Sequence, residues 1–366
     1  RRLIEGLPET CTKNRVAATR PGEILGAIQS HREGCVVLYS GDTGFYSGTR
    51  SLIPLLEKEG ISYTVLPGIS SVQLLSASLG RPWQDWLLCS AHGVNCNPVG
   101  AVMQGKPVFF LTGGELGPAE LCRQLAEAGL PELPVVVGEN LSYPGQRIRR
   151  GTAGEFAKEK FDSLSVLLAE PAPAVTRRTP GFPDSLFTRG EVPMTKQEVR
   201  AAVLAKLAPG SSDILWDVGA GTGSVSIELA LAASWGRTYA IECNEKACDL
   251  IRINREKLGA WNLKLVEGAA PQALDGLETA DAVFFGGTKG SMENVVDLVL
   301  DRNPKANICI SAICIETLYQ AVKALQNRGI QPEVTQISIS RGKAAGSLHL
   351  LMANNPIFLI AGNCDG

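Results

Sequence analysis

The stretch Asp217-Val218-Gly219-Ala220-Gly221-Thr222-Gly223 decides the fold of the C-terminal half of this chain. It follows an apolar run at 213–218 and precedes a segment of helical periodicity at 224–234, which indicates a turn between a strand and a helix. Its glycines allow a tight turn and a close approach of a ligand, and free N–H groups at a helix start favour a carboxylate or phosphate. The sequence therefore predicts a ligand site at the carboxyl end of a strand in an α/β sheet.

Strands and helices continue to alternate on both sides of this turn. We expect strands at 213–218, 237–242, 262–267, 281–285 and 306–312, and helices at 195–207, 224–234, 245–258, 290–302 and 315–328. Thr195, with Glu198 three residues later, predicts an N-cap and a capping box for the first of these helices. The runs at 332–340, 347–353 and 356–361 predict an antiparallel hairpin that ends a parallel sheet.

Two further segments complete the expected cofactor site. Glu242 ends the strand after the glycine turn, where its carboxylate can accept hydrogen bonds from both hydroxyls of a ribose. Ala269 and Ala270 follow the next strand and leave room for a flat ring such as adenine. A glycine-rich turn alone also suits a dinucleotide, but this one differs from the G-x-G-x-x-G fingerprint. We therefore predict S-adenosyl-L-methionine as the cofactor, in contact with Gly219, Ala220, Gly221, Thr222 and Gly223.

The upstream half also carries apolar runs of strand length. They lie at 35–40, 63–66, 86–90, 107–112, 134–138 and 164–169, and amphipathic segments at 49–59 and 118–128 separate some of them. Continuous rather than alternating apolar residues indicate strands buried on both faces, as in α/β proteins. Five prolines and no sustained apolar period mark 171–193 as a linker. We therefore expect two α/β domains, at 1–170 and 194–366, the second of them Rossmann-like.

The composition limits the classes of function. The chain has 366 residues, of which 45% are hydrophobic and 20% charged, as in a globular protein with a sizeable core. The net charge of −2 argues against a nucleic-acid or membrane-surface partner. No apolar run reaches the length of a membrane span and no signal peptide opens the chain, so we expect a cytoplasmic protein. The spacings of the 10 cysteines predict reduced core residues and no metal site.

The C-terminal half resembles the decarboxylating precorrin methyltransferases of cobalamin biosynthesis. The resemblance rests on PMTKQEVR at 193–200, DVGAGTG at 217–223, AIE at 240–242, GAAP at 268–271 and FFGG at 284–287. It implies a class I methyltransferase fold that acts on carbon 15 of a tetrapyrrole and removes the acetate carboxyl of ring C. It also implies that Thr195 contacts the cofactor.

The upstream half resembles the class III tetrapyrrole methylases, specifically those that act on carbon 5. The matching motifs are SGDTGFY at 40–46, PGISSVQ at 67–73, WQD at 83–85, SAHG at 90–93 and GENLS at 138–142. The resemblance implies a second cofactor site that includes Gly41, Asp42, Ser70 and Ser71. The family's opening strand and its G-x-G-P-G loop are absent here, so we expect a truncated domain. Thr43 replaces the family's usual proline, and Val94 stands where the family has arginine.

Together the halves resemble the fused precorrin-6 C5,15-methyltransferases (decarboxylating). A substrate rich in carboxylates implies cationic residues around its site, because arginine binds carboxylates in a bidentate manner. We expect Arg189, Lys196 and Arg341 to bind the substrate, with Arg341 in the loop of the terminal hairpin. Further candidates are Arg177, Arg178 and Lys343. The proton donor for decarboxylation is not identified, and a metal-free and a cobalt-containing substrate are equally compatible with the sequence.

Three alternatives stay open. In the first, only the C-terminal half is active and the upstream half serves docking or dimerisation. In the second, the chain is a class I methyltransferase that acts on RNA or protein, which the lack of a basic field disfavours. In the third, it is a non-catalytic tetrapyrrole-binding module. The resemblance also implies a homo-oligomer.

Overall fold

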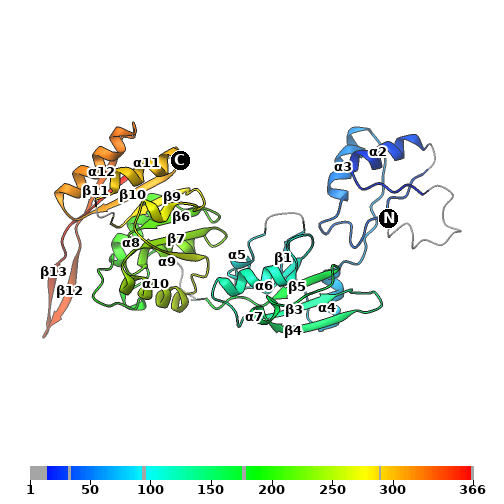
Figure 1. Ribbon diagram of the computed structural model, residues 1–366, viewed down its shortest axis with the longest axis horizontal. Coiled ribbons are helices and arrows are strands. Elements are labelled where there is room, and N and C mark those ends of the chain that lie inside the picture. The colour runs from blue at the N-terminus through cyan, green and yellow to red at the C-terminus, as the bar shows by residue number, and fades with distance from the viewer. Residues whose placement is uncertain (1–14, 32–33, 93–95, 175–178, 288–289, 364–366) are drawn as a thin grey trace.

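The computed structural model describes residues 15–31, 34–92, 96–174, 179–287 and 290–363. Its sheets form two α/β units that follow one another along the chain (Figure 1). The predicted fold class is confirmed, with a Rossmann-like C-terminal sheet that ends in antiparallel strands. None of the described helices is both long and apolar enough to cross a membrane.

The C-terminal sheet has seven strands in the order β11-β14-β10-β9-β6-β7-β8. Its strands are β6 (Ile214–Val218), β7 (Arg237–Glu242), β8 (Leu263–Glu267), β9 (Ala282–Phe285), β10 (Asn307–Ala312), β11 (Glu333–Ile337) and β14 (Ile357–Gly362). Its helices are α8 (Gln197–Leu207), α9 (Ser224–Ala232), α10 (Glu245–Leu258), α11 (Met292–Arg302) and α12 (Ile315–Asn327). Strands β6 to β10 pair in parallel, so their carboxyl ends, including that of β6 before the glycine turn, share one edge.

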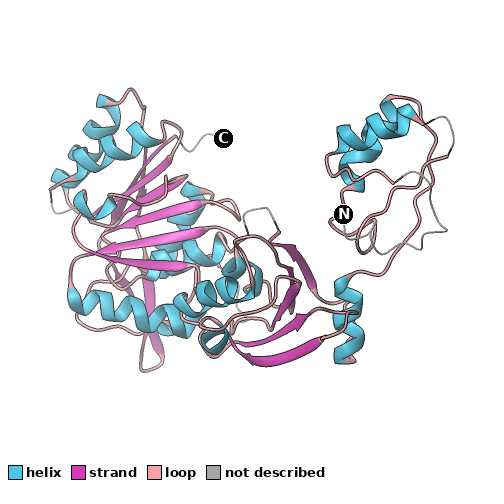
Figure 2. Cartoon of the chain, turned by 45° about the vertical axis from the view of Figure 1, so that its right-hand side comes forward, coloured by secondary structure: helices cyan, strands magenta, loops and turns pink. Residues whose placement is uncertain are grey.

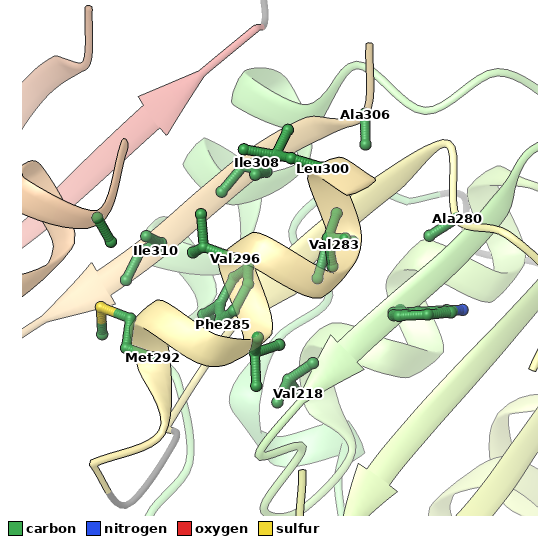
Figure 3. Packing of buried hydrophobic residues seen from close by; sticks show 14 of the residues in the cluster. Val218, Ala280, Val283, Phe285, Met292, Val296, Leu300, Ala306, Ile308 and Ile310 are labelled. Atoms are coloured by element: carbon green, nitrogen blue, oxygen red, sulfur yellow. The ribbon is translucent and has the colours of Figure 1, made fainter. Parts of the chain in front are cut away.

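The core of this domain forms where apolar strands meet the apolar faces of helices. Val295, Val296 and Val299 recur at helical spacing on α11 and are all buried. Figure 3 shows Val296 of α11 lying over Phe285 of β9, within one continuous cluster. The outermost hairpin, β12 (Ser340–Ala345) with β13 (Leu348–Ala353), instead forms a separate two-stranded ribbon that projects from the domain (Figure 1). Arg341 therefore lies on β12 and not in the hairpin loop, which corrects the prediction.

The N-terminal sheet is mixed and has the order β1-β2-β5-β3-β4. Its strands are β1 (Leu87–Ser90), β2 (Val108–Leu111), β3 (Pro134–Glu139), β4 (Arg147–Thr152) and β5 (Ser165–Ala169). The helices of this half are α2 (Pro21–Ser30), α3 (Thr49–Lys58), α4 (Ser71–Leu79), α5 (Pro98–Val102), α6 (Pro118–Glu127) and α7 (Ala153–Phe156). Strand β4 was not predicted, because its sequence RIRRGT is polar and its pairing with β3 at the sheet edge supplies the stabilisation.

The predictions of strands at 35–40 and 63–66 were wrong. Both segments are without regular structure, and Val36 and Leu66 are 85% and 72% exposed. An apolar run becomes a strand only when neighbouring strands pair with it, and neither segment has such a partner among the described residues. Helices α2 and α3 pack on each other in a small cluster with Ile24 and Leu52. Figures 1 and 2 show this pair standing apart from the β1–β5 sheet.

The two domains share an interface that the sequence did not reveal. Trp261, in the loop before β8, packs into the core of the N-terminal domain, and its indole N–H donates to the carbonyl of Pro173 at 2.7 Å. The Asn97 amide donates to the carbonyl of Trp235 at 2.7 Å. A Cβ at Gly100 would lie 2.9 Å from the Ser234 carbonyl oxygen, so the backbones are in close contact there.

We expect Trp261→Ala to weaken this interface. Deleting a buried aromatic side chain typically costs about 3–5 kcal/mol. Differential scanning calorimetry should therefore show an earlier, broader or split transition as the two domains lose their mutual support. Trp83, which is 39% exposed, offers the matched control, since Trp83→Ala should shift the transition little. A Trp261→Ala profile that superimposes on the wild-type profile would contradict the assigned interface.

Candidate functional site

The glycine turn joins β6 to α9 as the sequence predicts. Gly219, Gly221 and Gly223 have φ values of 78°, 57° and 75°, in the left-handed region that favours glycine. A Cβ at Gly219 would lie 2.1 Å from the Gly287 carbonyl oxygen. A Cβ at Gly223 would lie 2.9 Å from Cγ1 of Ile251. The turn is thus pressed against two neighbouring elements and exists only with glycine at these positions.

Glu242 at the end of β7 lies directly against this turn. Its Oε2 accepts a hydrogen bond from the Gly221 N–H at 2.8 Å. Its Oε1 accepts from the N–H groups of Cys243 and Asn244, at 2.8 and 2.9 Å. The carboxylate is fixed as an acceptor at the carboxyl edge of the sheet, because β7 is the parallel neighbour of β6.

The expected adenine loop begins beside Glu242. The Gly268 N–H donates to the Glu242 carbonyl at 2.8 Å, which places the start of the loop at the same edge. Ala269 is exposed, while Ala270 is partly buried and its carbonyl accepts from the Ser291 hydroxyl at 3.2 Å. The structure thus brings Glu242 and the start of the loop carrying Ala269 and Ala270 together, and their role toward adenine stays a prediction.

Asp217 lies beneath the turn and is 1% exposed. One carboxylate oxygen accepts from the Ser226 hydroxyl, while Oδ1 has no hydrogen-bond partner among the described residues, and neither has Oγ1 of Thr222. Burial raises the pKa of Asp217, the hydrogen bonds of Ser226 oppose this shift and the negative charge of Glu242 adds to it, so that the pKa is about 7. Two buried polar atoms without partners next to a glycine turn are suited to a polar or cationic ligand.

The segment before α8 differs from its prediction. Helix α8 begins at Gln197 with Lys196 as its N-cap and no side-chain cap, so the capping box of Thr195 and Glu198 was wrong. Asp184 supplies the acceptor instead, 3.0 Å from the Gln197 N–H. The carboxylate of Glu198 is engaged by Arg341.

Thr195 nevertheless belongs to the segment that reaches the turn. The Pro193 carbonyl oxygen lies 3.3 Å from the position of a Cβ at Gly221, and the Thr195 carbonyl accepts from Arg200. The start of segment 193–195 therefore lies against the glycine turn at Gly221. Thr195 stays a predicted cofactor contact.

The three predicted substrate cations differ in their surroundings. Arg341 donates to both oxygens of Glu198, at 3.2 and 2.5 Å, and to Oδ2 of Asp184 at 3.0 Å. Arg189 is exposed and Lys196 partly buried, and neither forms an ion pair with a described residue. Arg177, Arg178 and Val94 lie outside the described residues, and Lys343 is exposed on β12.

The motifs of the N-terminal domain also meet in space. The Asp42 carboxylate accepts from the N–H groups of Gly44 and Gly68, at 2.7 and 3.1 Å. A Cβ at Gly41 would lie 3.4 Å from the Ser70 hydroxyl oxygen. Ser70 is the N-cap of α4, which begins at Ser71. The four predicted residues therefore lie where the Gly41–Asp42 loop adjoins the start of α4.

An apolar surface that the sequence analysis did not predict lies beside the C-terminal site. Ile313, Ile315 and Tyr319 follow the carboxyl end of β10, and Ile315 is 77% exposed. The Ser311 hydroxyl donates to the Phe285 carbonyl at 3.3 Å, just before the Gly286–Gly287 loop that contacts Gly219. This surface thus continues the edge that carries the glycine turn.

Comparison with known proteins identifies both domains. Residues 185–362 match the precorrin methyltransferase domain, and residues 13–157 match the tetrapyrrole (corrin/porphyrin) methylases. A relative from Sinorhizobium sp named precorrin-6Y C(5,15)-methyltransferase [decarboxylating] is 32% identical over 319 residues, covering 86% of this chain and 76% of the relative. The chain belongs to the precorrin-6Y C5,15-methyltransferase family.

Other relatives of this precorrin-6Y methyltransferase family member have about half its length. A probable cobalt-precorrin-6B C(15)-methyltransferase (decarboxylating) from Pyrobaculum calidifontis is 43% identical over 185 residues, covering 50% of this chain and 95% of the relative. The corresponding Salmonella typhimurium protein is 39% identical over 181 residues, covering 49% and 93%. S-adenosyl-L-methionine is the methyl donor, as predicted. The glycine turn, Glu242 and the unpartnered Asp217 and Thr222 atoms fit a ligand with ribose hydroxyls and an ammonium group.

We expect Asp217→Asn to change how stability depends on pH. The pKa of Asp217 is raised from 3.8 to about 7, so at pH values between these two the folded protein keeps a proton that the unfolded chain has lost. Wild-type stability therefore falls as the pH rises through this window, by about 2–3 kcal/mol between about pH 5 and pH 8 relative to Asp217→Asn. Urea unfolding of both proteins at the two pH values measures the difference.

A second variant tests the same assignment. Ser226→Ala removes the hydroxyl that stabilises the charged carboxylate, so it should move the titration to higher pH. Parallel stability profiles for wild type and Asp217→Asn would show that Asp217 does not titrate in this range.

Proposed function

We propose that this chain transfers methyl groups from S-adenosyl-L-methionine to carbons 5 and 15 of a precorrin-6 type tetrapyrrole and decarboxylates its ring C acetate, in cobalamin biosynthesis. The observation that carries the proposal is the assembled site of the glycine turn and Glu242 in a chain aligned with a precorrin-6Y methyltransferase over 86% of its length. The C-terminal domain serves carbon 15 and decarboxylation. Relatives named C(15)-methyltransferases have about the same length as the domain at 185–362, which supports this assignment.

The chemistry needs position more than strong acid–base groups. A reduced tetrapyrrole has enamine-like meso carbons, and the donor's methyl group is activated by its sulfonium. The meso carbon attacks the methyl carbon as the carbon–sulfur bond breaks, and S-adenosylhomocysteine leaves with the electron pair. In-line placement of the two reactants can supply much of the acceleration. Loss of carbon dioxide leaves its electron pair in the conjugated macrocycle, which then takes up a proton.

We place this activity in the cytoplasm and in a homo-oligomer, without nucleic-acid or membrane partners. The net charge of −2 supports a small-molecule substrate over a nucleic acid. The exposed side chains of Leu348 and Leu351 on the β12–β13 hairpin support association with further copies of the chain.

A second candidate is activity of the C-terminal domain alone. It is favoured by the segments at 35–40 and 63–66, which flank the Asp42 and Ser70 loops and have no strand partners among the described residues. In that case the upstream domain supports the interface at Trp261 and does not methylate.

Mass spectrometry of the product separates the two candidates. The chain is incubated with S-adenosyl-L-methionine and with metal-free or cobalt-containing precorrin-6 type substrate. We expect a gain of two methyl groups with loss of one carbon dioxide, and Gly221→Val should abolish the carbon-15 methyl and the decarboxylation because its side chain would strain the turn. Asp42→Ala should abolish the other methyl. A gain of one methyl supports the second candidate, and an unchanged substrate would overturn both.

We expect the macrocycle to lie on Ile313, Ile315 and Tyr319. Ligand sites present apolar surface to flat hydrophobic ligands, with few polar groups fixing the orientation. Ile315→Asp should raise the KM for the tetrapyrrole by about tenfold or more, the equivalent of about 1.4 kcal/mol, and leave cofactor affinity unchanged. Val334→Asp, at the amino end of β11, is the matched control because Val334 is also exposed.

Glu242→Ala should give the opposite pattern. The variant lacks the carboxylate that is predicted to accept hydrogen bonds from the ribose hydroxyls. Loss of these bonds should weaken S-adenosyl-L-methionine binding by about 1–3 kcal/mol. Steady-state kinetics with each reactant varied in turn distinguish the two effects. If Ile315→Asp changed the KM for both reactants equally, the apolar surface would not be part of the tetrapyrrole site.

A further inference from the structure

A buried ion pair joins α8 to α9. Neither of its residues was among the site residues that the sequence predicted. Arg200 and Glu228 are both fully buried, and Nε of Arg200 donates to Oε1 of Glu228 at 2.8 Å. Removing two charges from water is costly, and an apolar pair of similar volume often stabilises a fold equally well. The further hydrogen bonds of this pair therefore indicate what it does.

Those bonds converge on one segment of the chain, 179–195. Glu228 accepts from the Thr179 hydroxyl at 2.8 Å and from the N–H groups of Gly181 and Phe182. Arg200 donates to the carbonyls of Phe182 and Thr195 and, at 2.9 Å, to Oδ1 of Asp184. Among the described residues, every remaining partner of the two charged groups thus lies on this segment.

Apolar packing holds the same segment on the domain. Phe182 and Phe187 are buried in one cluster with Ile227 and Ile251, and the Arg200 guanidinium lies 4.6 Å from the centre of the Phe187 ring. Burial of these rings stabilises the attachment of the segment but does not fix its exact position, since the hydrophobic effect is non-directional. The hydrogen bonds of Arg200 and Glu228 fix the backbone at defined atoms.

The far end of the segment lies at the cofactor turn. The Pro193 carbonyl oxygen is 3.3 Å from the Cβ position of Gly221, and the Val192 Cγ1 is 3.9 Å from it. The Thr195 carbonyl, two residues on, is the atom that Arg200 holds. The ion pair therefore sets the distance between segment 193–195 and the glycine turn.

We propose that Arg200 and Glu228 are positioning residues for S-adenosyl-L-methionine, which hold segment 193–195 over Gly221 so that the site is formed before the ligand arrives. The inference rests on the proposed function only for the identity of the ligand. A site that is already ordered binds its ligand more tightly, because no free energy is lost in ordering the segment when the ligand binds. Loss of the ion pair should thus weaken binding even where the fold survives.

The test uses three variants of the full chain. Arg200→Lys keeps the charge but cannot reach all acceptors of the guanidinium, and Glu228→Gln keeps the shape without the charge. The double variant Arg200→Met with Glu228→Leu replaces the pair by apolar side chains and protects the fold. Isothermal titration with S-adenosyl-L-methionine gives the Kd, urea unfolding gives stability, and hydrogen exchange without ligand reports on the amides of residues 194 and 195.

We expect each variant to bind S-adenosyl-L-methionine at least about tenfold more weakly and to exchange amide hydrogens at 194–195 faster than wild type. The double variant should do so while retaining near wild-type stability. The matched control is the ion pair of Arg237 and Glu278, 2.5 Å apart at the opposite edge of the sheet. Arg237→Lys and Glu278→Gln should leave the Kd unchanged.

Two results would overturn the proposal. One is a folded double variant with wild-type Kd, which would show that the ion pair does not position segment 193–195 for the ligand. The other is unchanged hydrogen exchange at 194–195 in all three variants. A wild-type chain that does not bind S-adenosyl-L-methionine would instead contradict the proposed function, and the exchange measurement would still report whether the ion pair fixes the segment.

Discussion

Backbone contact between two glycine-containing loops constrains the whole C-terminal site. A Cβ at Gly219 would lie 2.1 Å from the Gly287 carbonyl oxygen, and a Cβ at Gly286 would lie 2.7 Å from the Gly219 carbonyl oxygen. The ends of β6 and β9 can therefore approach this closely only without side chains. On one side of the contact lies Glu242, held by the Gly221 N–H, and on the other lies the apolar surface after β10. Glu242, proposed to bind the methyl donor, and the apolar surface proposed to bind the acceptor thus lie on the two sides of this contact.

Three acidic side chains around this contact show how surroundings determine the behaviour of a carboxylate. Glu242 receives three backbone N–H groups, and Glu228 is paired with Arg200 and satisfied by segment 179–195. Asp217 has one hydroxyl donor and a buried oxygen without a partner, and burial raises its pKa to about 7. A bound ammonium group would supply the missing charge and lower that pKa, since opposite charges favour the ionised form. A cofactor that places its ammonium group beside Asp217 would therefore bind together with release of the Asp217 proton.

The sequence predicted those features that depend on local patterns. The glycine turn, the five parallel strands and the position of Glu242 follow from apolar periodicity and from the rule that parallel strands end at one edge. The strands at 35–40 and 63–66 were predicted by the same periodicity and failed, because pairing partners are a property of the fold. Thr195 failed as an N-cap because the Gln197 N–H donates instead to Asp184, 13 residues upstream of Gln197. The ion pair of Arg200 and Glu228 was missed because charged residues in helices are ordinarily solvated.

The two domains meet away from the glycine turn of the C-terminal domain. Trp235 and Trp261 immediately precede β7 and β8, so the upstream domain contacts the edge of the C-terminal sheet at which strands begin. The glycine turn, Glu242 and Ile315 lie at the edge at which strands end. Helix α9 connects the two edges, running from the turn to Ala232 beside the interface. The interface thus lies at the edge of the C-terminal sheet opposite the glycine turn and Glu242, and none of these interface contacts involves the turn.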